Sequence, residues 1–218
     1  MRDLRLLLGL PQVYRLFVRA VGQRRELYID EYVQPRAGQR ILDIGCGPGD
    51  VLEYLPDGVE YLGVDHNQGY IEAARKRFGH RGLFLCQDAN AVAISEPHSF
   101  DIVMANGLLH HLNDEQAGNL LSIASRALKP GGRLCTYDGC YLPRQSPLIK
   151  LLLSMDRGKF VRNKEQYEHL ASRHFSSVAA HIRHDLQSIP YTILIMVCCG
   201  EGAGSDRAQL AGAGMVAS

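Results

Sequence analysis

The residues best placed to do chemistry lie in the segment 41–50, which reads Ile-Leu-Asp-Ile-Gly-Cys-Gly-Pro-Gly-Asp. An apolar run that contains one carboxylate, Asp43, leads here into a turn with three glycines. Because glycine has no β-carbon, such a turn lets a small molecule approach the main chain closely. The amides at the start of a following helix favour electron-rich groups. The segment therefore predicts a buried strand, a tight turn and a small-molecule site.

The spacing of these glycines argues against a dinucleotide such as NAD. In the dinucleotide-binding pattern, Gly-x-Gly-x-x-Gly, two residues separate the second glycine from the third. Here Asp50 stands where that third glycine belongs, and Gly49 comes one residue earlier. Because an aspartate that faces a pyrophosphate repels it, we expect a ligand without phosphate at this turn.

A second carboxylate, Asp65, ends the apolar run 61–65 and lies 22 positions after Asp43. In a nucleotide-binding βαβ unit, an acidic residue at about this separation accepts hydrogen bonds from the ribose hydroxyls. The alternative is that Asp65 caps the next helix, but Asn67 already stands at a capping position. We therefore expect Asp65 to bind a ribose through its two oxygens, with His66 beside the sugar or the adenine edge.

The segment 41–50 resembles motif I of the class I S-adenosylmethionine (SAM) methyltransferases, in which an acidic residue precedes Gly-x-Gly-x-Gly. Further features follow in that family's order: Asp65, then Asp88, then the loop 106–112, then Leu-Lys-Pro-Gly-Gly at 128–132. The resemblance covers residues 40–138. It implies SAM as the cofactor, whose sulfonium and ammonium groups suit a carboxylate and whose structure contains no phosphate.

The resemblance also implies individual roles. Asp88 would accept the adenine amino group, the backbone amide of Ala89 would donate to the adenine ring, and the backbone of Ala105 or Asn106 would accept from the cofactor ammonium. The cofactor-binding residues implied in the sheet region are Asp43, Gly45, Cys46, Gly47, Asp65, His66, Asp88, Ala89, Ala105 and Asn106.

Two adjacent histidines, His110 and His111, follow the predicted strand 100–105. Imidazole titrates near neutral pH and can take a proton from a hydroxyl or enol as a methyl group arrives. The alternative is a structural loop, in which one ring packs and the other caps. The preceding residues 106–109 lack the prolines and the aromatic residue common in methyltransferases that act on amino groups of adenine, cytosine or glutamine. Both histidines are candidate catalytic bases.

The predicted elements form an α/β fold. The resemblance implies a Rossmann-like, doubly wound, mostly parallel sheet of seven strands, in which the antiparallel strand seven lies between strands five and six. Apolar patterns predict the seven strands at 40–44, 61–65, 82–86, 100–105, 133–138, 175–184 and 190–199, with Lys-Pro-Gly-Gly at 129–132 as a turn before the fifth. Helices are predicted at about 50–55, from Asn67 to Phe78, and from Asn113 to Leu128.

Two further segments are expected to shape the site. Helical patterns over 4–34 predict amino-terminal helices within residues 1–37, either as plain packing helices or as a lid from which Tyr14 or an arginine reaches the cofactor carboxylate. Contact of their arginines with a membrane surface is a weaker alternative. Residues 139–174 are expected to be an insertion between strands five and six on the substrate side. Its candidate substrate-binding residues are Asp156, Arg157 and Arg162, which could equally form a surface salt-bridge network.

Composition limits the remaining possibilities. The 218 residues suit one domain, expected at 1–200, with a flexible glycine- and alanine-rich tail at 201–218. The net charge of +1 gives no sign of nucleic-acid binding. No run suits a membrane span or a signal peptide, so we expect a cytoplasmic protein. The six cysteines have no zinc-like spacing, which predicts mostly buried, reduced thiols and no metal site.

The resulting hypothesis is methyl transfer from SAM to a small-molecule acceptor, with oxygen slightly favoured as the methylated atom. Alignment and desolvation can supply most of the rate of such a displacement. One alternative is an RNA or protein methyltransferase, which would need a basic stripe or a docking domain. Another is a SAM-binding protein without turnover.

Overall fold

The computed structural model describes residues 24–89, 97–147, 149–150, 153, 159–188 and 191–200. The predictions made for Tyr14, Asp156 and Arg157 lie outside these residues, as do those for the chain before residue 24 and for the tail 201–218. Of the residues described, none belongs to a helix long and apolar enough to cross a membrane.

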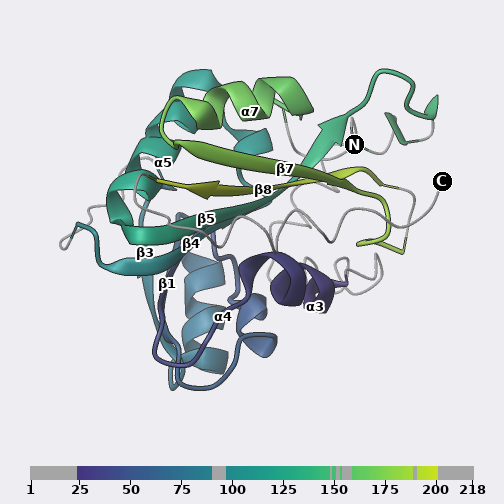
Figure 1. Cartoon of the computed structure of the whole chain (residues 1–218). Coiled ribbons are helices and arrows are strands. Elements are labelled where there is room, and N and C mark those ends of the chain that lie inside the picture. Colours follow the sequence, from purple (N-terminus) through teal and green to yellow (C-terminus); the bar gives the residue numbers. More distant parts are fainter. Residues whose placement is uncertain are drawn as a thin grey trace.

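One twisted sheet runs through the described part of the chain (Figure 1). Its main strands are β1 (Arg40–Ile44), β2 (Glu60–Asp65), β3 (Gly82–Cys86), β4 (Phe100–Asn106), β5 (Leu128–Tyr141), β7 (Ser177–Arg183) and β8 (Ile193–Cys199). They lie in the order β3-β2-β1-β4-β5-β8-β7. The first five are mutually parallel, and β8 pairs antiparallel with both β5 and β7. The predicted strand order, with its antiparallel last strand, is confirmed.

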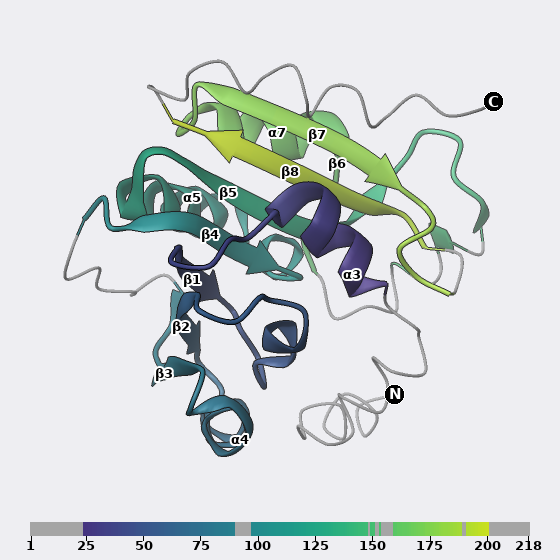
Figure 2. The same cartoon turned by 60° about the horizontal axis from the view of Figure 1, so that its bottom comes forward.

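Helices cover both faces of this sheet (Figure 2). One face carries α3 (Arg25–Tyr28) with the π-helical turn η1 (Ile29–Val33), the 3-10 turn η2 (Asp50–Glu53) and α4 (Gln68–Phe78); the other carries α5 (Asp114–Ala127) and α7 (Lys164–Ser172). Successive side chains of a strand point to opposite faces. On β4, accordingly, Ile102 and Met104 pack under α3 and α4, whereas Val103 and Ala105 pack under α5.

The string Lys-Pro-Gly-Gly was predicted to form a separate turn before the fifth strand, and this prediction is wrong. Helix α5 passes directly into β5 at Leu128, which pairs with Phe100, while Arg133 pairs with Ile102. The partner strand thus advances by two residues while β5 advances by five, and the string forms a bulge inside β5. Gly131 supplies the left-handed backbone there, with φ of +80°.

The predicted insertion 139–174 contains more regular structure than expected. After β5 ends at Tyr141, the two-residue strand β6 (Arg162–Asn163) pairs in parallel with the end of β5, and α7 follows at once. Asn163 and Gln166 form a reciprocal capping box at the start of α7. This capping box was a readable signal for a helix, which the prediction of an insertion over 139–174 did not include.

Candidate functional site

The glycine turn follows β1 and folds over the end of β2. The backbone amides of Gly45 and Cys46 both donate to the Val64 carbonyl, at 2.7 and 3.0 Å. Gly47 has φ of +55°, and a β-carbon built on it would meet no atom of the protein within 4 Å. The backbone is therefore bare on the open side of the turn at Gly47, as a closely held ligand requires.

The other two glycines of the turn serve packing. A β-carbon on Gly49 would lie 3.1 Å from the ring of Phe84 and 3.2 Å from that of Phe78, so this glycine lets β3 and α4 approach the turn. A β-carbon on Gly45 would lie 3.1 Å from the side chain of Leu108. Leu108 belongs to the loop after β4, which therefore contacts the glycine turn directly.

Asp65 ends β2 beside this turn, and its carboxylate is fixed by two backbone amides. Oδ2 accepts from the Gly47 amide at 2.9 Å, and Oδ1 accepts from the Asn67 amide at 2.8 Å. Each oxygen retains a further lone pair that could accept a ligand hydroxyl. Asn67 caps α4 by accepting from the Tyr70 amide, as predicted. His66 is 82% exposed, with Nδ1 3.7 Å from Asp65 Oδ1.

Asp43 lies on β1, on the face of the sheet that carries α3, and is almost fully buried. Its Oδ2 accepts a 2.7 Å hydrogen bond from the Tyr61 hydroxyl, but its Oδ1 has no hydrogen-bond partner among the described residues. Burial raises the pKa of Asp43 to about 6, although the Tyr61 hydrogen bond and the charge of Arg25 both lower it. The unsatisfied Oδ1 fits a cationic ligand group.

The residues predicted to contact adenine and ammonium groups lie at the same edge of the sheet. The amide of Gln87 donates to the Asp65 carbonyl, which places the exposed Asp88 and the half-buried Ala89 directly after it. Ala105 is buried near the end of β4, and Asn106 is that strand's last residue. These residues thus lie at or just beyond the carboxyl ends of β3 and β4, and their contacts with a cofactor stay predictions.

The amino-terminal segment reaches this edge through Tyr28, which was not predicted. Its hydroxyl donates to Asn106 Oδ1 at 2.6 Å, and its ring packs edge-on against Tyr137, with centroids 5.4 Å apart. The segment is tied down because Arg183 on β7 forms an ion pair with Glu31 and a hydrogen bond to Tyr32. Residues 25–33 therefore lie across β5 and reach the end of β4 through Tyr28, while their role as a lid stays a prediction.

The two histidines differ sharply in their surroundings. His110 is buried, and its Nδ1 lies 2.8 Å from Oδ1 of Asp138, itself only 1% exposed. The backbone amide of His110 donates to the same oxygen at 3.2 Å. His111 is exposed, and its ring centroid lies 4.3 Å from that of His110. Asp138, which the sequence analysis missed, therefore distinguishes His110 as the anchored ring.

Arg162 does not face a substrate, which corrects its predicted role. Its guanidinium is 7% exposed, and its donors are taken by Oδ1 of Asp114 and by the carbonyls of Leu109, Leu112 and Phe160. The amide of Phe160 in turn donates to the His110 carbonyl at 3.0 Å. Arg162 and Phe160 thus clasp the loop that carries both histidines.

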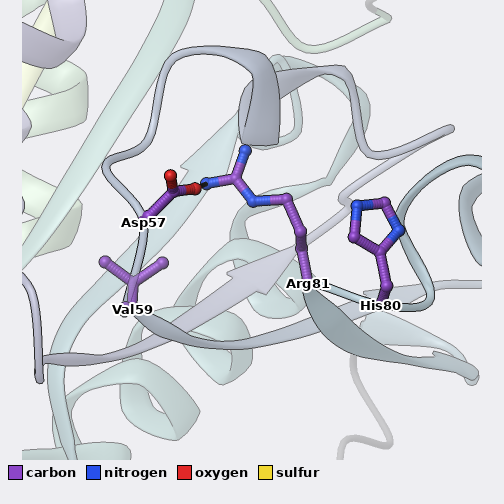
Figure 3. A pocket seen from close by; sticks show the side chains of 5 residues that line it. Asp57, Val59, His80 and Arg81 are labelled. Atoms are coloured by element: carbon purple, nitrogen blue, oxygen red, sulfur yellow. Dashed lines mark ion pairs between the residues drawn. The ribbon is translucent and has the colours of Figure 1, made fainter.

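A surface hollow is found elsewhere, at the amino-terminal ends of β2 and β3, and Figure 3 shows that an arginine bridges it. The residues that line it are Asp57, Gly58, Val59, His80 and Arg81. Arg81 pairs with Asp57 at 3.2 Å and donates to the carbonyls of Leu52 and Leu55. The donors of Arg81 therefore hold the loop after η2. The hollow lies at the edge of the sheet opposite the glycine turn, so it is separate from the site. Among the described residues, no three side chains gather as metal ligands.

Known proteins with similar sequences are methyltransferases. A family described as "Methyltransferase domain" matches residues 41–132. The chain is 30% identical over 111 residues to the ubiquinone biosynthesis O-methyltransferase of Idiomarina loihiensis, with 49% of this chain and 45% of that protein covered. It is 33% identical over 120 residues to the 27-O-demethylrifamycin SV methyltransferase of Amycolatopsis mediterranei, with 52% and 43% covered. The chain therefore spans about half the length of the curated relatives it matches.

A solved structure shares the fold. The phosphoethanolamine N-methyltransferase 2 of Haemonchus contortus, in complex with phosphomonomethylethanolamine and S-adenosylhomocysteine, superposes with a TM-score of 0.66 at 22% identity. The match covers 82% of this chain and 53% of that one. Motif order, strand order and these matches agree. Residues 41–132 thus match a methyltransferase domain, and the fold around them is that of a solved SAM-dependent methyltransferase, which supports a class I SAM-dependent methyltransferase.

Proposed function

We propose that this chain transfers a methyl group from SAM to a small-molecule acceptor, with an oxygen atom as the favoured site of methylation. The observation that carries the proposal is the presence of two fixed carboxylates, Asp43 on β1 and Asp65 at the end of β2, of which Asp65 accepts from the amide of Gly47, whose backbone is bare. When bound, SAM supplies a methyl group on a cationic sulfonium. The names of two relatives, which describe O-methyltransferases, support oxygen as the acceptor atom.

In this proposal each residue has a separate task. Asp65 accepts hydrogen bonds from the ribose hydroxyls, and Oδ1 of Asp43 faces the cationic methionine part of the cofactor. Burial raises the pKa of Asp43 and of Tyr137, and the charge of Arg25 on α3 partly offsets both shifts; we assign the cofactor carboxylate to this arginine. Tyr28 and Asn106 close the site from the amino-terminal side.

The proposal is tested by incubating the protein with SAM labelled in its methyl group and with a lysate of the source organism. Small molecules are separated from macromolecules before counting. Label in the small-molecule fraction is the expected result. Label in RNA or protein would replace the small-molecule acceptor by a macromolecule. SAM binding by calorimetry without any labelled product would favour a binding protein without turnover.

Alanine variants of two glycines distinguish the effect of the turn on SAM binding from the effect of backbone strain on stability. Gly47 and Gly38 both have positive φ, and a β-carbon on either would meet nothing within 4 Å. Gly47→Ala and Gly38→Ala are therefore each expected to lower the free energy of unfolding by about 1 kcal/mol. Only Gly47→Ala is expected to weaken SAM binding, by about tenfold or more, because its methyl group fills the cradle. Equal SAM affinity in both variants, by calorimetry, would remove the cofactor from this turn.

The pKa of Asp43 predicts how SAM binding depends on pH. With a pKa of about 6, this carboxyl is mostly ionised at pH 7 and mostly protonated at pH 5. Because only the ionised form attracts a cation, SAM affinity is expected to fall by about tenfold between these pH values. In Asp43→Asn, affinity should be lower and independent of pH over this range. His66→Gln should retain the fall; its loss there would assign the titration to His66.

A further inference from the structure

One arginine, Arg183 on β7, holds residues 25–33, the strap, against the far end of the sheet. Nη1 of its guanidinium forms an ion pair with Glu31 and donates to the Tyr32 hydroxyl at 2.8 Å. Its Cζ lies over the Tyr32 ring, 5.6 Å from the centroid. Because β8 separates β7 from β5, this contact ties the strap to a strand remote from the glycine turn.

The guanidinium is itself fixed by the residues that follow β7. Nε and Nη2 donate to the two carboxylate oxygens of Asp185, each at 2.8 Å. Two parallel bonds of this kind hold the planar group in one orientation. The side chain of Arg183 is only 18% exposed, so solvent screens its ion pairs less than it would on an open surface. The Arg24 amide, just before the strap, donates to the Leu186 carbonyl at 2.9 Å. The end of β7 and the loop after it therefore hold the strap at two points.

The strap passes this restraint on to the candidate site. Tyr32 stacks on Tyr28, with ring centroids 6.4 Å apart, because residues four apart share one face of a helix. The Tyr28 hydroxyl donates in turn to Asn106 at the end of β4. Burial raises the pKa of Tyr28, and the charges of its neighbours, Asp43 among them, raise it further. A continuous chain of contacts thus leads from Arg183 to the buried carboxylate assigned to SAM.

We propose that Arg183 is a positioning residue for the cofactor site: through Glu31 and Tyr32 it holds Tyr28 in place, and so it sets how long SAM stays bound. The part that concerns SAM rests on the proposed function. Tyr28 and Tyr32 belong to one short helical segment, so the strap opens when the bonds of Arg183 break. Contacts that must break before a ligand leaves act mainly on its dissociation rate.

Amide hydrogen exchange on the full chain, without cofactor, tests the anchoring. In Arg183→Leu, the amides of residues 25–33 are expected to exchange about tenfold faster than in the wild-type protein. Arg40→Leu is the matched control, because Arg40 also lies on a strand, pairs with Glu60 and lies 5.2 Å from the centroid of the Phe100 ring. This variant should leave exchange in the strap unchanged. Wild-type exchange in Arg183→Leu, or equal acceleration in both variants, would overturn the anchoring.

Dissociation of methyl-labelled SAM, chased with unlabelled SAM, tests the effect on the cofactor. Arg183→Leu is expected to release SAM about tenfold faster, while the association rate changes by less than about threefold. Arg183→Lys, which keeps the charge, should restore part of the retention. Tyr32→Phe and Glu31→Gln each remove one contact of Arg183, so each should give a smaller increase. Added to Arg183→Leu, neither should increase the rate again, because the contact is already lost. Independent, multiplying effects would overturn the proposal.

The two measurements separate this inference from the proposed function. Hydrogen exchange needs no cofactor, so it decides the anchoring by itself. A wild-type release rate in Arg183→Leu, with SAM bound normally by the wild-type protein, would overturn the role in retention alone. Absence of SAM binding in the wild-type protein would overturn the proposed function and, with it, the role of Arg183 in retention.

Discussion

Replacement of Asp65 by alanine is expected to weaken SAM binding by about 100-fold or more. A hydrogen bond to a charged group contributes about 1.5–3 kcal/mol, and this carboxylate would accept two from the ribose. The change also leaves the Gly47 amide without its acceptor, so the turn that carries the bare backbone loses its order. Titration calorimetry with SAM measures the effect, and a wild-type dissociation constant in Asp65→Ala would overturn the ribose assignment.

A matched control removes a similar carboxylate at the other edge of the sheet. Asp101 on β4 accepts from the Arg40 amide at 2.8 Å and from Lys129 at 2.7 Å. Asp101→Ala therefore loses the hydrogen bond from the Arg40 amide and the ion pair with Lys129. Residue 101 lies where β4 begins, away from the glycine turn. SAM affinity is expected to stay at the wild-type value in Asp101→Ala. Equal losses in both variants would indicate general destabilisation.

The glycine turn and the two carboxylates near it were predictable as structure because their signals are local in sequence. The residues 41–50 specify strand, turn and carboxylate in one stretch, and parallel pairing of β1 with β2 then brings Asp65 to the same edge. Asn67 and Asn113 cap α4 and α5 as expected from their positions before apolar helical patterns. Short-range rules of capping and alternation were sufficient for these elements.

The contacts of Asp138 and Tyr28 were less predictable because they join distant parts of the chain. Asp138 meets His110 across 28 positions, and Tyr28 meets Asn106 across 78. Nothing near Tyr28 in the sequence indicates this partner. An acidic residue toward the carboxyl end of a parallel strand was a usable signal for Asp138, since ligands bind at that edge of such sheets.

Arg162 shows why charge alone misled the interpretation. Its neighbourhood in the sequence reads as a polar surface loop, yet the side chain is buried and faces three backbone carbonyls and the exposed carboxylate of Asp114. Carbonyls at the end of a short 3-10 turn need donors when they are buried. The guanidinium, with five N–H groups in a fixed plane, meets this need where no local amide can.

Arg162→Leu is therefore expected to lower the free energy of unfolding by about 3–5 kcal/mol, because buried carbonyls lose their donors. Arg162→Lys, which keeps the charge but offers fewer donors in a different geometry, should lose about half as much. Arg173→Leu, an exposed arginine after α7 whose contact is with His169, should change stability by less than about 0.5 kcal/mol. Urea unfolding followed by circular dichroism gives all three values. An Arg162→Leu midpoint equal to that of Arg173→Leu would show that the hydrogen bonds of Arg162 contribute nothing to stability. The orientation of His110 would then depend on Asp138 alone.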